Sequence, residues 1–307
     1  MENVANKGKG GKLRDYLMLT KPSLNIMVVF SSIICYLLAP KVVEFSWGMI
    51  ALLFMGGFLV TGSANAMNMA VEKDTDAMMK RTSTRPIAAG RMSVAEGWTF
   101  AIITGLAGVA ILSFFFNPLS GLLAAFSLFL YAFVYTPLKK VNAVAVLVGA
   151  FPGALPCLIG WAAGNDAVFG YGGSENWGGW VLFLIQFLWQ FPHFWAIAWI
   201  AHKDYSGAGF KLLPAEKGPT KFTAIQTVMY AVLLIPVCLL PYIINLTEFE
   251  STTGKVSLAL VMVANLFLIA QCVRLYNEMN AKAARRVMFS SYLYLPVVLL
   301  ALLASKA

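Results

Sequence analysis

Charged residues are scarce in this sequence of 307 residues. Asp, Glu, Lys and Arg together make up 12% of the chain, there are only two histidines, and hydrophobic residues reach 59%. A typical soluble domain contains about 25% charged residues. The shortage excludes an ordinary soluble protein, and the mean hydropathy of +0.73 indicates an integral membrane protein.

Several common site signatures are also missing. The sequence contains no GxGxxG loop, no Walker lysine loop and no internal repeat. Its four cysteines stand singly inside apolar runs, without the CxxC spacing of a metal or redox pair. We interpret them as small hydrophobic residues within helices. The charged, glycine-rich N-terminal segment lacks the apolar core of a cleavable signal peptide.

Long apolar runs make up most of the chain. A membrane-spanning helix needs about 20 mostly apolar residues. Nine runs qualify, at residues 23–40, 47–71, 97–116, 119–137, 142–163, 178–201, 221–246, 256–276 and 287–305. We therefore expect an all-α polytopic membrane protein with one nine-helix domain over residues 23–307, preceded by a cytoplasmic tail over residues 1–22.

Lysine and arginine are divided unevenly between the two sides of these runs. A cytoplasmic N-terminus places twenty of the 23 Lys and Arg residues in cytoplasmic segments, as is typical of short loops in membrane proteins. The opposite side keeps Lys41, Lys255 and Lys306, and it also contains the C-terminus. Membrane topology accounts for the net charge of +9, so we expect no nucleic-acid partner.

A cluster of acids follows the second apolar run, in the stretch NAMNMAVEKDTDAMMKRTSTRP. Asn68, Glu72 and Asp76 are spaced by four residues, so each lies only about 40° further around a helix and all three share one face. Two carboxylates one turn apart repel each other unless a cation lies between them. Amide and carboxylate oxygens suit Mg²⁺, so we predict a magnesium half-site. A solvated helix end is the alternative interpretation.

Basic residues surround this half-site in the sequence. The candidates are Lys80, Arg81 and Arg85 just downstream, and Lys139 and Lys140 in YTPLKK after the fourth run. Arginine binds phosphate oxygens bidentately and lysine supplies a point charge, so this set favours a diphosphate substrate. Pro86 should turn Arg81 and Arg85 back toward the acids. For Arg91, membrane topology is the better explanation.

Polar residues also interrupt and end the sixth apolar run. His193 lies inside it, in QFPHFW, and either a functional role or a hydrogen-bonded packing role explains an imidazole there. Lys203, Asp204 and Tyr205 follow in HKDY, where Asp204 could complete the metal site or pair with Lys203. The glycines and prolines of residues 149–164 should kink or closely pack the fifth helix.

Taken together, these motifs resemble the UbiA-type intramembrane prenyltransferases, and within them the protohaem farnesyltransferase branch. The likeness includes the first acidic motif, YTPLKK, GAFPGALPCLIGWAA, WQFPHFWAIAW and AGFKLLP, and it runs from LTKPSL at Leu19 to the last helix. Glu72 departs from the family pattern, which usually has Asp there. The single acid of HKDY favours the haem branch over the quinone-directed relatives, whose second motif is richer in acids.

This resemblance implies nine helices around a central cavity open to lipid, with the two polar motifs facing each other at the cytoplasmic end. It implies farnesyl diphosphate as the donor, haem b as the acceptor, Mg²⁺ as the cofactor and haem O as the product, in the inner (cytoplasmic) membrane. A haem A synthase or terminal-oxidase assembly proteins are the implied partners.

Site roles follow from the motifs and the resemblance together. Asn68, Glu72, Asp76, Lys80 and Arg81 are the expected catalytic residues, with Lys80, Arg81, Arg85, Lys139 and Lys140 binding the diphosphate. The metal ligands would be Asn68, Glu72, Asp76 and Asp204. The candidates for the haem or for a second motif are His193, Lys203, Asp204 and Tyr205.

Two other functions fit part of the pattern. A prenyltransferase that acts on a quinone precursor or another aromatic acceptor would share the metal motif and differ in its acceptor pocket. A cation-coupled transporter also places acids and broken helices inside a bundle. The absence of an inverted repeat in the sequence, and the basic cluster beside the acids, count against transport.

Overall fold

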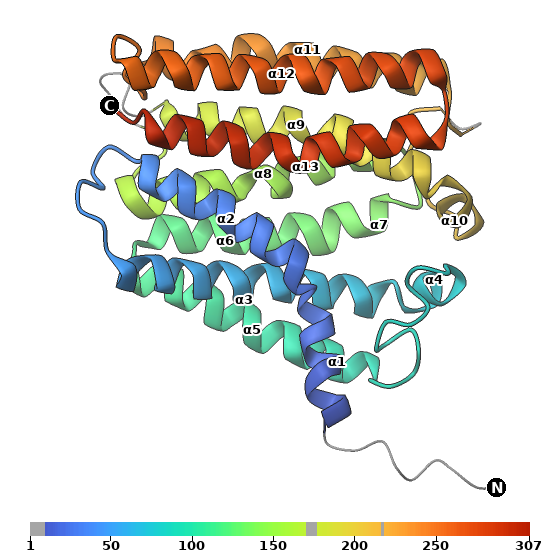
Figure 1. Cartoon of the computed structure of the whole chain (residues 1–307). Helices are drawn as coiled ribbons and strands as arrows, with labels where there is room; N and C mark the ends of the chain where they lie inside the picture. The colour runs from blue at the N-terminus through green and yellow to red at the C-terminus, as the bar shows by residue number, and fades with distance from the viewer. Residues whose placement is uncertain (1–9, 170–176, 216–217) are drawn as a thin grey trace, which may run out of the picture.

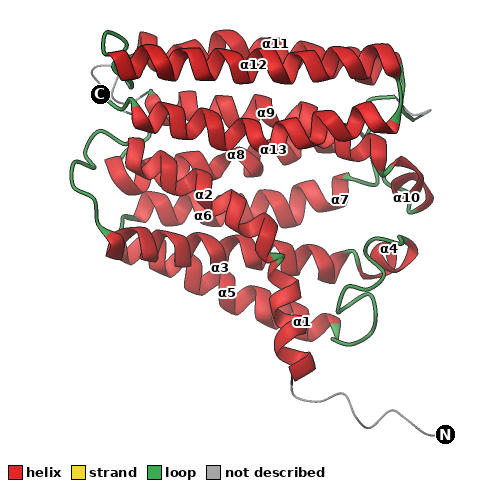
Figure 2. Cartoon of the chain, viewed as in Figure 1, coloured by secondary structure: helices red, strands yellow, loops and turns green. Residues whose placement is uncertain are grey.

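The computed structural model describes residues 10–169, 177–215 and 218–307, which form helices joined by short loops (Figures 1 and 2). The long helices are α2 (Pro22–Leu38), α3 (Trp47–Val71), α5 (Val94–Phe115), α6 (Pro118–Phe129), α8 (Val144–Asn165), α9 (Gly178–Ile200), α11 (Lys221–Ile243), α12 (Thr252–Glu278) and α13 (Ala281–Ala304). The short ones are α1 (Gly10–Thr20), α4 (Lys73–Met78), η1 (Leu130–Tyr135), α7 (Thr136–Leu138) and α10 (His202–Gly207).

The helices match the predicted spans closely. Within the described residues, eight segments are long and apolar enough to cross a membrane, one of them formed by α6, η1 and α7 together. A ninth candidate consists of α1 and α2, which are bent by 42° relative to each other. The protein is therefore a multi-pass membrane protein. Within the predicted tail, residues 10–20 form a helix, and residues 1–9 lie outside the described part.

Polar side chains fix where several helices begin. Ser46, Asn117, Ser251 and Asn280 each accept a hydrogen bond from a backbone N–H in the first turn of the helix that follows. Ser93 and Glu96 form a complete capping box at the start of α5. Such caps satisfy backbone groups that the helix itself leaves unpaired, which allows short loops between the spans.

Helix α8 packs closely against its neighbours, as its glycines and prolines predict. Pro152 and Pro156 lie inside the continuous helix. A side chain added at Gly160 would collide with the backbone of Ser32 in α2, and one at Gly153 would collide with Gln190 in α9. Close backbone approach at small residues is the usual way in which membrane helices associate.

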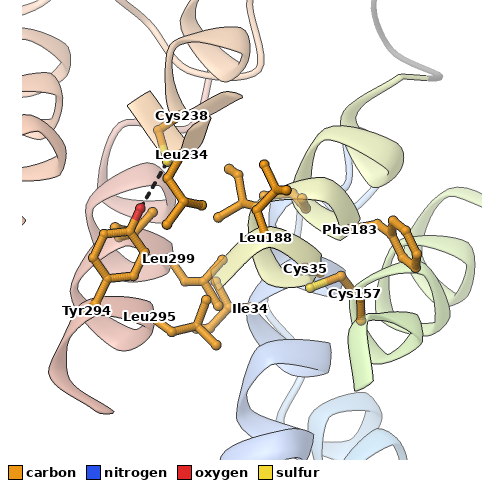
Figure 3. Packing of buried hydrophobic residues seen from close by; sticks show 14 of the residues in the cluster. Ile34, Cys35, Cys157, Phe183, Leu188, Leu234, Cys238, Tyr294, Leu295 and Leu299 are labelled. Carbon is orange, nitrogen blue, oxygen red and sulfur yellow. Dashed lines mark hydrogen bonds between the residues drawn. The ribbon is translucent and has the colours of Figure 1, made fainter. Parts of the chain in front are cut away.

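The apolar core lies between the long helices (Figure 3). All four cysteines are buried and unbridged, which confirms their interpretation as small interior residues. Cys238 lies 3.2 Å from the hydroxyl of Tyr294, and Cys157 donates to Gln186 at 3.0 Å. A polar group in an apolar interior needs a hydrogen-bond partner. Here the partners lie on neighbouring helices, so the contacts connect α11 to α13 and α8 to α9.

The bundle has two ends of different character. Figure 1 shows α4, α7 and α10 together at one end of the long helices, while the C-terminus lies at the other. The residues of both polar motifs belong to the first end. The fold thus brings together segments that are far apart in the sequence. We call this end of the bundle the basic end, because Lys and Arg residues are concentrated there.

Candidate active site

Asn68, Glu72 and Asp76, here called the ligand stripe, lie where α3 passes into α4. The helix is interrupted at Glu72, whose backbone has φ −92° and ψ 16°. The turn spacing survives the interruption, because the N–H of Glu72 donates to Asn68 O at 2.9 Å and the N–H of Asp76 donates to Glu72 O at 2.7 Å. Each of the three residues is at most 5% exposed. The alternative of a solvated helix end is therefore wrong for these three residues.

Each member of the ligand stripe has a different cation beside it. Lys139 Nζ donates to Glu72 Oε1 at 2.9 Å. One guanidinium nitrogen of Arg85 donates to both carboxylate oxygens of Asp76 at 2.7 Å. Lys21 Nζ lies 3.5 Å from Asn68 Oδ1. The three cations come from three separate segments of the chain, so the site forms only when the bundle folds.

Lys139 is held over aromatic rings. Its ammonium lies 4.5 Å from the ring centroid of Tyr135 and 5.9 Å from those of Tyr131 and Phe210. The two tyrosines belong to η1, a π-helical turn, and such turns occur frequently at functional sites. Cation–π attraction and the Glu72 carboxylate together compensate for burying the charge of Lys139.

The two polar motifs face each other at the basic end (Figure 1). Arg81 donates to the hydroxyl of Tyr205 in α10 at 3.1 Å. Met79 packs with Ala208 and Phe210 in a small buried cluster between the segments after α4 and α10. The expected return of Arg85 to the acids is confirmed, whereas Arg81 reaches the second motif instead.

Other candidates stand apart from the ligand stripe. Lys80, Lys140 and Lys203 are exposed, and Asp204 is partly buried. Within the described residues, no three Asp, Glu, His or Cys side chains gather in a metal-binding arrangement. Asp204 as a further metal ligand stays a prediction.

His193 faces α13. Its Nδ1 lies 2.8 Å from Ser291 Oγ, and its ring stacks on Trp189 with centroids 4.9 Å apart. Its partners among the described residues fit the packing role; a role toward haem remains a prediction.

Comparison with known proteins shows the family of this chain. The UbiA prenyltransferase family matches residues 28–293. The chain belongs to the UbiA prenyltransferase family. It is 40% identical over 291 residues to a protoheme IX farnesyltransferase of Cytophaga hutchinsonii, covering 95% of this chain and 97% of that relative.

Two solved structures share this UbiA fold. One, of a digeranylgeranylglyceryl phosphate synthase, has a TM-score of 0.75 and 21% identity, and the match covers 96% of this chain and 98% of that one. The other is a UbiA homologue from Archaeoglobus fulgidus bound to GPP and Mg²⁺, with a TM-score of 0.62, 16% identity and coverage of 94% and 99%.

The ligand stripe of this UbiA member fits a magnesium ion by its chemistry. Its donors are two carboxylates and one amide oxygen, the hard oxygen ligands that Mg²⁺ prefers. Asn68 Nδ2 is also buried and has no hydrogen-bond partner among the described residues, so it is available to a bound anion. The neighbouring cations suit the phosphate oxygens that usually complete the coordination of Mg²⁺.

An apolar cavity begins one helical turn from the ligand stripe. Asn65 and Tyr131 are among its lining residues, and the lining is mainly formed by apolar residues of α2, α3, α6 and α8. Its volume is about 100 Å³. A ligand with its charged group at the ligand stripe would have its apolar part beside this cavity.

Two features of the site were missed at the sequence level. In the sequence, Lys21 counts only among the twenty cytoplasmic Lys and Arg residues, although its place in LTKPSL, directly before a helix, is a usable signal. Arg91 was also assigned to topology, but its guanidinium forms an ion pair with Asp15 of α1 at 2.9 Å. No local pattern predicts that pair, because the two residues are far apart in the chain.

Proposed function

We propose that this protein transfers the farnesyl group of farnesyl diphosphate to a vinyl group of haem b, with addition of water, to give haem O and diphosphate. The observation that carries the proposal is the buried ligand stripe with a cation beside each member, one helical turn from an apolar cavity. The 40% identity to a protoheme IX farnesyltransferase supports haem as the acceptor.

The diphosphate is the leaving group, and its stabilisation is the main catalytic task. Asn68, Glu72 and Asp76 would hold Mg²⁺, which would neutralise the negative charge that develops on the diphosphate. Arg85 and Lys139 supply further fixed positive charge at the same place. Groups that are already oriented toward the developing charge stabilise the transition state more than the ground state.

The bond changes balance as follows. The bond between C1 of the farnesyl chain and oxygen breaks, and its electron pair leaves with the diphosphate. The π electrons of the haem vinyl group form the new carbon–carbon bond, and a water oxygen bonds to the carbon beside the ring and releases a proton. The apolar cavity shields the allylic cation from earlier capture by water.

The orientation in the membrane follows from the distribution of basic residues. We propose that the basic end, with the ligand stripe and α10, faces the cytoplasm and that the C-terminus lies on the opposite side of the inner membrane. His193, Lys203, Asp204 and Tyr205 stay as candidate contacts of the haem. Lys80, Arg81 and Lys140 stay as candidate contacts of the diphosphate near the membrane surface.

The test compares acceptors with one purified preparation in nanodiscs. Farnesyl diphosphate and Mg²⁺ are supplied with haem b or with 4-hydroxybenzoate, and the products are separated and weighed by mass spectrometry. We expect a farnesylated haem that is absent with Asp76→Asn or without metal. Prenylation of the aromatic acid alone would overturn the haem assignment, and no prenyl transfer to any acceptor would overturn the proposed reaction.

A further inference from the structure

Lys21 has an unusual backbone conformation at the bend between α1 and α2. Its dihedral angles are φ 48° and ψ 68°, in the left-handed region, which few residues other than glycine adopt. Pro22 follows, and a residue before proline normally takes an extended conformation. A non-glycine residue persists in such a conformation only where its surroundings hold it, and these positions cluster at functional sites.

The segment around Lys21 is fastened to α3. Asn65 Nδ2 donates to the carbonyl oxygen of Thr20 at 3.2 Å. Asn25 Nδ2 donates to the carbonyl oxygen of Phe58 at 2.8 Å. These two bonds lie on either side of Lys21 and fix its backbone beside the helix that carries the ligand stripe, so its side chain is directed by the fold.

The ammonium of Lys21 has different neighbours from the other two cations of the site. Lys139 and Arg85 are each paired with a carboxylate. Among the ion pairs between described residues, none includes Lys21, whose Nζ has the neutral Asn68 Oδ1 as its hydrogen-bond partner. Asn68 Nδ2 is itself unpaired. A lysine that belongs to none of these ion pairs and an unpaired amide donor are thus adjacent, a combination that suits an anionic oxygen.

We propose that Lys21 and Asn68 Nδ2 together bind an oxygen of the donor's diphosphate, so that Lys21 determines the preference for a prenyl diphosphate over an uncharged isoprenoid. This inference rests on the proposed function, because it assumes a diphosphate donor at the ligand stripe. It adds a binding residue from the bend between α1 and α2 to a site whose other members come from α3, α4, the loop after α4 and the residue after α7.

The test measures the affinity of the protein in nanodiscs for farnesyl diphosphate in the presence of Mg²⁺ and, separately, for farnesol. Lys21→Gly removes the ammonium and accepts the left-handed backbone, while Lys21→Arg keeps the charge. Asn245→Gly is the matched backbone control, since Asn245 has φ 55° and is exposed. Lys73→Ala, at an exposed lysine of α4, is the charge control.

We expect Lys21→Gly to bind farnesyl diphosphate about 10- to 100-fold more weakly than the wild type, the range for a hydrogen bond to a charged group. Farnesol binding should stay unchanged, and Lys21→Arg and both controls should bind like the wild type. Equal loss of both ligands in Lys21→Gly would mean that Lys21 only shapes the fold, and no loss would also overturn the inference. A wild type that does not prefer the diphosphate would overturn the proposed function instead.

Discussion

Glu72 provides one of the two carboxylates of the ligand stripe, and its side chain is one methylene longer than that of Asp76, which provides the other. Its longer side chain places a carboxylate oxygen 2.9 Å from the buried ammonium of Lys139. Removing the charge would leave Lys139 buried without its partner, and it would also remove a proposed metal ligand. Shortening the side chain by one methylene would keep the charge, so charge and length are separable at this position.

Glu72→Gln and Glu72→Asp make that separation measurable. We expect kcat/KM for farnesyl diphosphate to fall by more than about 100-fold in Glu72→Gln, because loss of a ligand should exceed the roughly 10- to 100-fold cost of losing a group that supports one. Glu72→Asp should lose less than ~10-fold. Steady-state kinetics at saturating Mg²⁺ give both values. Wild-type kinetics in Glu72→Gln would exclude a catalytic role for this carboxylate.

Helix α1 differs from the long helices in that the sequence did not predict it. Hydropathy predicted the long helices well, since apolar runs in a membrane protein leave few alternatives. Hydropathy did not predict α1, which forms an ion pair with Arg91 through Asp15, or the interruption at Glu72. The four-residue spacing in the sequence predicted the ligand stripe. It did not predict the cations beside the stripe, because contacts between distant segments leave no local periodicity.

Hydrogen exchange of α1 tests the role of that ion pair. Asp15 and Arg91 have side chains that are 10% and 26% exposed, so their pairing should stabilise α1 against opening. We expect Arg91→Gln to raise exchange over residues 10–20 by ~5-fold, which corresponds to about 1 kcal/mol. Lys12→Gln, which breaks the exposed pair with Glu96, should raise it by less than about 2-fold. Similar exchange in both variants would contradict the assignment.

At the scale of the whole molecule, Lys306 connects the C-terminal segment to the end of α2. Its ammonium donates to the carbonyl oxygens of Leu37, Ala39 and Val42, each at 2.8 Å. These carbonyls lie at and just after the end of α2, where a helix leaves acceptors unsatisfied and favours a nearby cation. The sequence showed Lys306 only as one of three lysines on the side with little basic charge.

Lys306→Met should therefore lower the midpoint of thermal unfolding in detergent. The loss corresponds to roughly 1–3 kcal/mol, because three hydrogen bonds from one charged donor disappear while the apolar stem remains. Lys255→Met is the control, since Lys255 is exposed on the same side of the bundle. An equal midpoint in the two variants would show that the contact adds no stability.

The most direct test of the central claim follows the haem product in water enriched in ¹⁸O. The purified protein in nanodiscs receives farnesyl diphosphate, haem b and Mg²⁺, and the haem fraction is weighed by mass spectrometry. We predict a haem that has gained one farnesyl group and one oxygen, with that oxygen carrying the ¹⁸O label, and no such product in Asp76→Asn. Unchanged haem, together with transfer of the farnesyl group to another acceptor and release of diphosphate, would exclude haem as the acceptor.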